Sequence, residues 1–144
     1  MAEVARRAVV VGAGRVGAAL ARTLHEEEWD VTVVDQSESG LNRLGAKWPG
    51  RFVLGHGMDR ATLEEAGIEG ADCLVAATNG DNTNILIAQV ARKMYHVPRV
   101  AVRVLDPARA DVYQRRGFEV VCPTAYAVQH LRGWLLREAP EGER

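Results

Sequence analysis

The sequence predicts an α/β fold built on a doubly wound, parallel sheet of six strands. Three observations support this prediction: six short apolar segments alternate with segments of helical character, each apolar segment is a continuous run, and a glycine-rich turn follows the first. Continuous apolar runs are typical of strands buried on both faces by helices. Right-handed crossovers then favour the Rossmann-like strand order 3-2-1-4-5-6, with a ligand at the switch point between the first and fourth strands.

The strands are predicted from their apolar runs and from the breakers that follow them. They cover Arg7–Gly12, Asp30–Asp35, Arg51–Leu54, Cys73–Ala77, Val100–Val104 and Phe118–Val121.

The helices between these strands are predicted from capping and stop signals. Asp59 and Asp106 are suitable N-caps, and Ser37 or Ser39 can cap the second helix. Glycine and proline breakers such as Pro98 set the ends. The expected helices cover Arg15–Glu28, Ser37 or Ser39 to a point before Trp48, Arg60–Ala66, Asp81 or Asn82 to about Tyr95, Asp106–Gly117, and Pro123 or Thr124 to about Glu138.

The length and composition are those of one soluble domain. The chain has 144 residues, of which 47% are hydrophobic and 26% charged, and its net charge is −1. A nucleic-acid-binding domain would show a basic excess, and no apolar stretch reaches the roughly 18 residues of a membrane span. No apolar region follows Arg6-Arg7, so no secretory signal is predicted. We expect a cytoplasmic protein with one domain over residues 1–144, a core over about 7–122 and a C-terminal helix over about 123–138.

The cysteines and histidines do not predict a metal site. Cys73 and Cys122 lie far apart in apolar surroundings, which favours buried free thiols over a disulfide or a metal site. The four histidines lack metal-ligand spacing with these cysteines. No catalytic residue is predicted either, because His130 has no partner and Tyr113 lacks the Tyr-x-x-x-Lys spacing of a short-chain reductase.

The turn after the first strand predicts a site for an anionic ligand. In Gly-x-Gly-x-x-Gly, Gly12 makes the tight turn, Gly14 lets a diphosphate approach the backbone, and Gly17 lets the helix lie close to the sheet. The helix N-terminus adds unpaired N–H groups and partial positive charge. Asp35 ends the second strand 18 residues after Gly17, near the roughly 20-residue spacing of a carboxylate that binds an adenosine ribose. This context favours a nucleotide-binding βαβ unit over an ordinary glycine-punctuated helix start.

A polar loop after the fourth strand is expected to form the opposite wall of this site. The loop contains Thr78, Asn79, Asp81 and Asn84, whose small side chains can bind phosphate, ribose or neighbouring backbone. We favour Thr78 and Asn79 for ligand contact over Asp81 and Asn84, since such residues also cap helices.

Two further features leave alternatives open. Arg103, near the carboxyl end of the fifth strand, is either a phosphate or inter-subunit contact or one half of an ordinary salt bridge. In the last helix, Val128, Leu131 and Leu135 form an apolar stripe beside Trp134. This stripe packs on the chain's own sheet or exchanges with a second protomer, with Trp134 as an anchor, and each alternative can hold for a different part of it.

Several motifs follow one another in the order found in one known family. They are Gly12-x-Gly14-Arg15-Val16-Gly17, Asp35, Gly55, Leu63-x-x-Ala66-Gly67-Ile68, Ala71-Asp72-x-x-Val75-Ala76-Ala77-Thr78-Asn79-x-Asp81-x-x-Asn84 and Gly117-Phe118-x-x-Val121-x-Pro123. The chain resembles, over roughly residues 7–136, the RCK N-terminal (TrkA-N) domain, the cytosolic regulatory module of bacterial potassium channels and transporters. The motif at the fourth strand is the more specific part of this resemblance.

The resemblance implies a sensor and not an enzyme. Members bind NAD(H) or adenine nucleotides such as ATP and ADP, assemble as homodimers and rings, and act on a membrane partner at the inner face of the cell membrane. By position, Asp35 would take the ribose hydroxyls, and Gly14, Arg15 and Val16 would lie against the phosphates. The cofactor-binding residues implied in this way are Gly12, Gly14, Arg15, Val16, Gly17, Asp35, Gln36, His56, Gly57, Ala77, Thr78, Asn79 and Arg103.

The chain departs from the family pattern in two places. Many members carry aspartate where this chain has His56, whose imidazole can stack on or hydrogen-bond to the base. Many also carry a second, C-terminal ligand domain, so we expect this chain to be a short form or a piece of such a subunit. The charge of Asp35 makes NADP the least expected ligand.

Two other functions remain as hypotheses. The chain could be the cofactor domain of an NAD-dependent dehydrogenase, which turnover of a 2-hydroxy acid or an aldehyde would support. It could also be a cytosolic adenylate-binding protein without a membrane partner, which capture of a potassium transporter would exclude.

Overall fold

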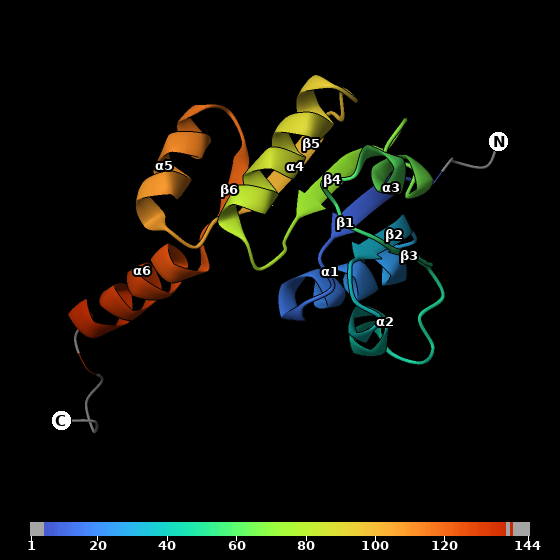
Figure 1. The fold of residues 1–144 in the computed structure, drawn as a ribbon. Helices are drawn as coiled ribbons and strands as arrows, with labels where there is room; N and C mark the ends of the chain where they lie inside the picture. Colours follow the sequence, from blue (N-terminus) through green and yellow to red (C-terminus); the bar gives the residue numbers. More distant parts are fainter. Residues whose placement is uncertain (1–4, 138, 140–144) are drawn as a thin grey trace.

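The computed structural model describes residues 5–137 and 139 of the chain, and these residues form alternating strands and helices (Figure 1). The strands are β1 (Arg7–Val11), β2 (Asp30–Asp35), β3 (Arg51–Leu54), β4 (Cys73–Ala76), β5 (Arg99–Arg103) and β6 (Glu119–Val121). The helices are α1 (Arg15–Glu26), α2 (Ser39–Leu44), α3 (Arg60–Glu65), α4 (Asp81–Lys93), α5 (Pro107–Arg115) and α6 (Pro123–Leu136).

The six strands form one sheet in the order β3-β2-β1-β4-β5-β6. Every neighbouring pair is parallel, so the predicted fold class and strand order are confirmed. The register aligns Val11 at the end of β1 with Val34 of β2 and Ala76 of β4. The carboxyl ends of the central strands therefore lie together at one edge of the sheet, on either side of the β1–β4 switch point.

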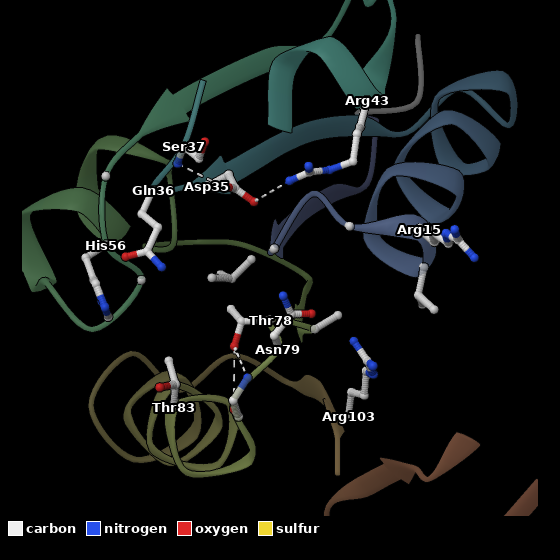
Figure 2. A pocket seen from close by; sticks show the side chains of 18 of the residues that line it. Arg15, Asp35, Gln36, Ser37, Arg43, His56, Thr78, Asn79, Thr83 and Arg103 are labelled. Carbon is white, nitrogen blue, oxygen red and sulfur yellow. Dashed lines mark hydrogen bonds and ion pairs between the residues drawn. The ribbon is translucent and has the colours of Figure 1, made fainter. Parts of the chain in front are cut away.

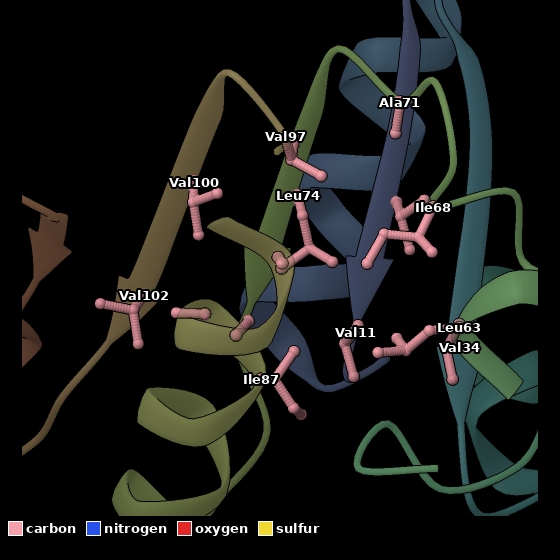
Figure 3. Packing of buried hydrophobic residues seen from close by; sticks show 14 of the residues in the cluster. Val11, Val34, Leu63, Ile68, Ala71, Leu74, Ile87, Val97, Val100 and Val102 are labelled. Carbon is pink, nitrogen blue, oxygen red and sulfur yellow. The ribbon is translucent and has the colours of Figure 1, made fainter. Parts of the chain in front are cut away.

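Two apolar clusters cover the two faces of the sheet. Successive side chains of a strand point to opposite faces, so β1 contributes to both clusters. On one face, Val10 and Val33 pack with Ala18 and Ala21 of α1. On the other face, β1, β4 and β5 pack against α3 and α4, with Ile87 of α4 among the contacts (Figure 3). This two-sided burial explains why the central strands are continuous apolar runs in the sequence.

Most predicted element boundaries lie within two residues of the observed ones. Asp59 and Asp106 cap their helices as predicted: each carboxylate accepts a hydrogen bond, 3.1 Å long, from the backbone N–H two residues ahead. The serine cap predicted for α2 was wrong. Its N-cap is Glu38, without a side-chain hydrogen bond. Ser37 lies one residue before this N-cap, and its hydroxyl oxygen accepts from the Ser39 N–H at 3.2 Å and lies 2.8 Å from the Ser39 hydroxyl oxygen.

The last helix, α6, extends away from the sheet (Figure 1). It contains no buried residue, and Trp134 is 59% exposed, so packing of this helix on the chain's own sheet was the wrong alternative. The predicted end at Glu138 lies outside the described residues. Large apolar side chains along α6 that are exposed are Tyr126, Val128, Leu131, Trp134, Leu135 and Leu136.

The cysteines are free thiols, as predicted, but both are only partly buried. Burial raises the pKa of the Cys73 thiol. Within residues 5–137 and 139, no group of three or more His, Cys, Asp or Glu side chains is placed to hold a metal ion. None of the described helices is both long enough and apolar enough to cross a membrane.

Candidate functional site

A cavity of about 700 Å³ opens at the carboxyl ends of the central strands, at the predicted switch point (Figure 2). A volume of this size suits a small-molecule ligand, since such sites measure roughly 300–1,000 Å³. The residues that line it are Val11, Gly12, Gly14, Arg15, Val16, Asp35, Gln36, Ser37, Arg43, Gly55, His56, Gly57, Ala77, Thr78, Asn79, Gly80, Thr83, Arg103 and Pro123. Twelve of the thirteen predicted site residues are in this set, and Gly17 is the exception.

The three glycines of the turn have different surroundings. Gly12 has φ +103°, and a Cβ there would lie 2.5 Å from the Ala77 carbonyl oxygen, so only glycine fits. Gly17 lies beneath the turn, outside the cavity, where a Cβ would meet the Gly12 carbonyl oxygen. Its role is therefore close packing of α1, as the motif predicts. A Cβ at Gly14 would have no atom within 4 Å, which leaves room for a ligand against this backbone.

The N-terminus of α1 faces the cavity through Gly14, Arg15 and Val16. Gly14 is the N-cap and provides no side-chain hydrogen bond to the helix. The N–H groups of the first turn have no acceptor within the helix, and the helix dipole adds partial positive charge there. This end of the cavity is therefore suited to a phosphate or another anion.

Asp35, at the end of β2, holds the glycine turn in place. Its Oδ2 accepts a hydrogen bond from the Ala13 N–H at 2.8 Å, and its Oδ1 accepts one from the Ser37 N–H at 2.9 Å. A carboxylate has about four lone-pair sites, so both oxygens keep acceptor capacity for a ligand. Gln36 follows Asp35, and Figure 2 shows Gln36 and His56 on one side of the cavity, with Arg15 and Arg103 on the other.

In the loop after β4, the polar residues divide into those that line the cavity and those that build it. Thr78 and Asn79 line the cavity, whereas Asn84 is fully buried and does not. The Asn84 Oδ1 accepts from the Thr78 N–H at 2.8 Å and from the Thr78 hydroxyl at 2.6 Å. Its Nδ2 donates to the carbonyls of Thr78 at 2.9 Å and Arg103 at 3.0 Å. The Asn84 amide is thus used within the protein.

Asp81 also has a structural role. Its two carboxylate oxygens accept hydrogen bonds from the backbone N–H groups of Leu105 and Asp106, at 2.9 Å and 3.2 Å. Asp81 is outside the lining of the cavity. Together with Asn84 it joins α4 to the end of β5 and the residues that follow it, on one side of the site.

His56 and Gly57 follow β3. The His56 Nδ1 lies 3.2 Å from the Met58 backbone nitrogen and accepts its N–H, so the proton of a neutral imidazole is on Nε2. Gly57 is buried, and a Cβ there would lie 2.5 Å from a Val11 methyl group. The exposed His56 ring is the side chain that this loop offers to a ligand, beside the cavity-lining backbone of Gly55 and Gly57.

Arg103 does not form the ordinary salt bridge that was one alternative. Neither of the ion pairs among the described residues includes it. Its Nε is buried without a hydrogen-bond partner in the described part of the chain, and its side chain points into the cavity (Figure 2). A buried donor without a partner is costly, and an anionic ligand would satisfy it.

The sequence interpretation missed several lining residues, chiefly Arg43, Thr83 and Pro123. Arg43 is on α2, and its Nε donates to the Ala13 carbonyl. A signal for it was available, because only three residues separate β2 from α2. So short a connection returns the helix to the end of the strand.

The charges around the cavity favour an anion. Three arginines, Arg15, Arg43 and Arg103, line it together with the single carboxylate of Asp35. The arginines keep their charge at any physiological pH, and the helix N-terminus adds to this positive field. The arrangement can therefore hold phosphate groups at one end and a polar ring system, such as a ribose, near the carboxylate.

Comparison with known proteins agrees with this geometry. Residues 8–123 match the sequence model of the TrkA-N domain. The chain is 44% identical, over 92% of its length, to the Trk system potassium uptake protein TrkA of Streptomyces coelicolor, and 33% identical, over 90%, to a TrkA homolog of Methanothermobacter thermautotrophicus. It spans 60% of the length of each of these relatives.

Among solved structures, the chain is similar to GsuK bound to ADP. The TM-score is 0.76 at 25% identity, over 91% of this chain and 34% of that one. The family model covers most of the chain and includes both the glycine turn and the residues after β4. The chain belongs to the TrkA-N domain family.

Proposed function

We propose that this chain is a nucleotide-binding regulatory module that controls potassium transport through a membrane partner. The observation that carries the proposal is the cavity itself, in which a free helix N-terminus and three arginines face one ribose-type carboxylate, Asp35. The link to potassium transport comes from the relatives, which are named as potassium uptake proteins. The chain acts by binding and not by catalysis.

The ligand is an adenosine compound with a diphosphate, namely ADP, ATP or NAD(H). Its phosphates lie on Gly14, Arg15 and Val16, with Arg103 as a further cation. Its ribose hydroxyls donate to Asp35, and its base lies toward Gln36 and His56, where the Nε2 proton meets a ring nitrogen. The ADP named with GsuK, a structure of the same fold, supports this class of ligand.

Occupancy of the site is passed on through α6. The cavity reaches Pro123, the first residue of α6, so a ligand there contacts the base of that helix. The apolar side chains that α6 exposes pack against a second copy of the chain, in a homodimer or a larger ring. If α6 takes different positions in the nucleotide-bound and nucleotide-free protein, the two forms assemble differently. The transporter at the inner face of the membrane then meets a different assembly in each form.

Calorimetric titration with ADP, ATP, NAD and NADH tests the ligand. At least one of them is expected to bind with a stoichiometry of one per chain. An Arg103→Gln variant is expected to bind more weakly, and an Arg99→Gln variant, at the other end of β5 and outside the cavity, is the matched control. Failure of all four nucleotides to bind would overturn the proposal.

A second experiment tests the partner. The chain is expected to co-purify with the membrane subunit of a potassium transporter from the same cells, in an amount that changes when the binding nucleotide is added. Nucleotide binding without this association would favour an adenylate-binding protein that acts elsewhere.

A further inference from the structure

Arg43 and Asp35 together hold both backbone polar groups of one residue in the glycine turn. The residue they hold is Ala13, between Gly12 and Gly14. Its N–H donates to Asp35 Oδ2 at 2.8 Å, and its carbonyl accepts from Arg43 Nε. Ala13 is fully buried, so neither of these groups can be satisfied by bulk water instead.

The guanidinium of Arg43 also connects the turn to β2 and α2. Its Nη2 lies 3.9 Å from Asp35 Oδ2, and its Nη1 lies 3.3 Å from the Ser39 hydroxyl oxygen. Figure 2 shows Arg43 reaching from α2 toward Asp35. The rigid fork of a guanidinium can span these groups simultaneously, whereas a lysine amine acts as a point charge.

This use of Arg43 differs from that of the other cavity arginines. Within the described residues, Arg15 and Arg103 take part in no ion pair, which leaves them for the ligand. The guanidinium of Arg43 instead contacts groups of the protein, beside the Asp35 carboxylate that is proposed to bind the ribose. A shift of that carboxylate would change its reach to a ribose hydroxyl.

We propose that Arg43 is a positioning residue of the ribose subsite: by holding the Ala13 carbonyl and flanking Asp35, it sets the carboxylate for a ribose 2′-hydroxyl. The inference rests on the proposed nucleotide site and adds a residue that determines sugar specificity. Arg43 acts through Asp35, and its loss is felt in the preference for ribose over deoxyribose more than in overall phosphate binding.

The test compares ADP with 2′-deoxy-ADP. Wild-type protein is expected to prefer ADP by roughly tenfold or more, because a hydroxyl donating to a charged acceptor contributes that much. In Arg43→Ala the preference is expected to fall to about threefold or less. Arg43→Lys keeps the positive charge but not the fork, so its preference should fall in the same way.

Arg22→Ala is the matched control. Arg22, on α1, donates to the Arg43 backbone carbonyl at 2.8 Å and lies outside the cavity lining. Its removal takes one guanidinium from the same α1–α2 contact and should leave the preference for ADP unchanged. An Arg43→Lys or Arg43→Ala variant with wild-type preference, or a wild-type protein that binds both sugars equally, would overturn the inference.

Amide hydrogen exchange gives a second measurement that needs no ligand. The Ala13 N–H is expected to exchange at least about tenfold faster in Arg43→Ala than in wild type, with unchanged exchange in Arg22→Ala. If the wild-type protein binds neither nucleotide, the proposed function fails. Amide exchange at Ala13 still tests whether Arg43 positions the glycine turn. Unchanged protection of Ala13 in Arg43→Ala would overturn that role on its own.

Discussion

The Asn84 side chain, buried in α4, makes three hydrogen bonds to Thr78, accepting from its N–H and hydroxyl and donating to its carbonyl. A fourth bond, from Nδ2 to the carbonyl of Arg103, connects the loop after β4 to the end of β5. One amide therefore satisfies backbone groups of the two segments that form one side of the cavity, and it does so without reaching the ligand space.

We predict that Asn84→Ala lowers the free energy of unfolding by about 3 kcal/mol, because several buried polar groups lose their partner. Urea unfolding measures this. Asn82→Ala is the control, since Asn82 is an exposed α4 residue that accepts a hydrogen bond from Arg109; it should change stability by less than about 0.5 kcal/mol. Equal stability of the two variants would contradict the role assigned to Asn84.

Two substitutions in the glycine turn are expected to have different effects, one on protein stability and the other on nucleotide binding. Gly12→Ala should cost about 2 kcal/mol or more of stability, because alanine is strained at positive φ and its Cβ would overlap the Ala77 carbonyl. Gly14→Ala should stay within about 0.5 kcal/mol of wild type, since its Cβ enters open space, yet it should weaken nucleotide binding. Thermal unfolding and calorimetry on both variants check this. Loss of stability in Gly14→Ala with unchanged affinity would contradict it.

Asp35→Ala is expected to weaken binding of adenosine nucleotides by about 1–3 kcal/mol, because the ribose hydroxyls lose a charged acceptor. The variant should also lose some stability, since the carboxylate holds the N–H groups of Ala13 and Ser37. Affinity is therefore measured at a temperature where the variant is folded, as judged by circular dichroism. A folded Asp35→Ala protein with wild-type affinity would remove Asp35 from the site.

The exposed face of α6 predicts a change in assembly without a change in the fold. Leu131→Glu should convert a homodimer to a monomer, because it places a charge among apolar side chains that a second copy would bury. Leu131 is 56% exposed, and α6 has no buried residue, so the spectrum of the folded domain should be unchanged. Sedimentation velocity measures the assembly, with Arg132→Ala as the control on the same helix. A Leu131→Glu protein that stays dimeric would exclude this face of α6 as the interface.

The fold could be predicted almost entirely from local signals. Apolar runs, two aspartate caps and a glycine turn led to the observed strand order. One failure was also local in origin: Ser37 and Ser39 look like caps in sequence, but they lie on either side of the N-cap Glu38, and the Ser37 hydroxyl oxygen contacts the N–H and the hydroxyl of Ser39. The apolar stripe of α6 predicted burial without indicating against which chain, and in the described structure these side chains are exposed.

The sequence by itself determined where the cavity lies, because glycine at positive φ and the alternation of strand and helix are set by residues adjacent in the chain. Only the tertiary structure decided which polar side chains face that cavity. Arg43 reaches Ala13 across 30 residues, and Asn84 reaches Arg103 across 19. Hydrogen bonds between segments so far apart depend on how helices pack on the sheet. The short connection from β2 to α2 places the helix near the end of the strand, but it does not specify which side chain of α2 reaches the turn.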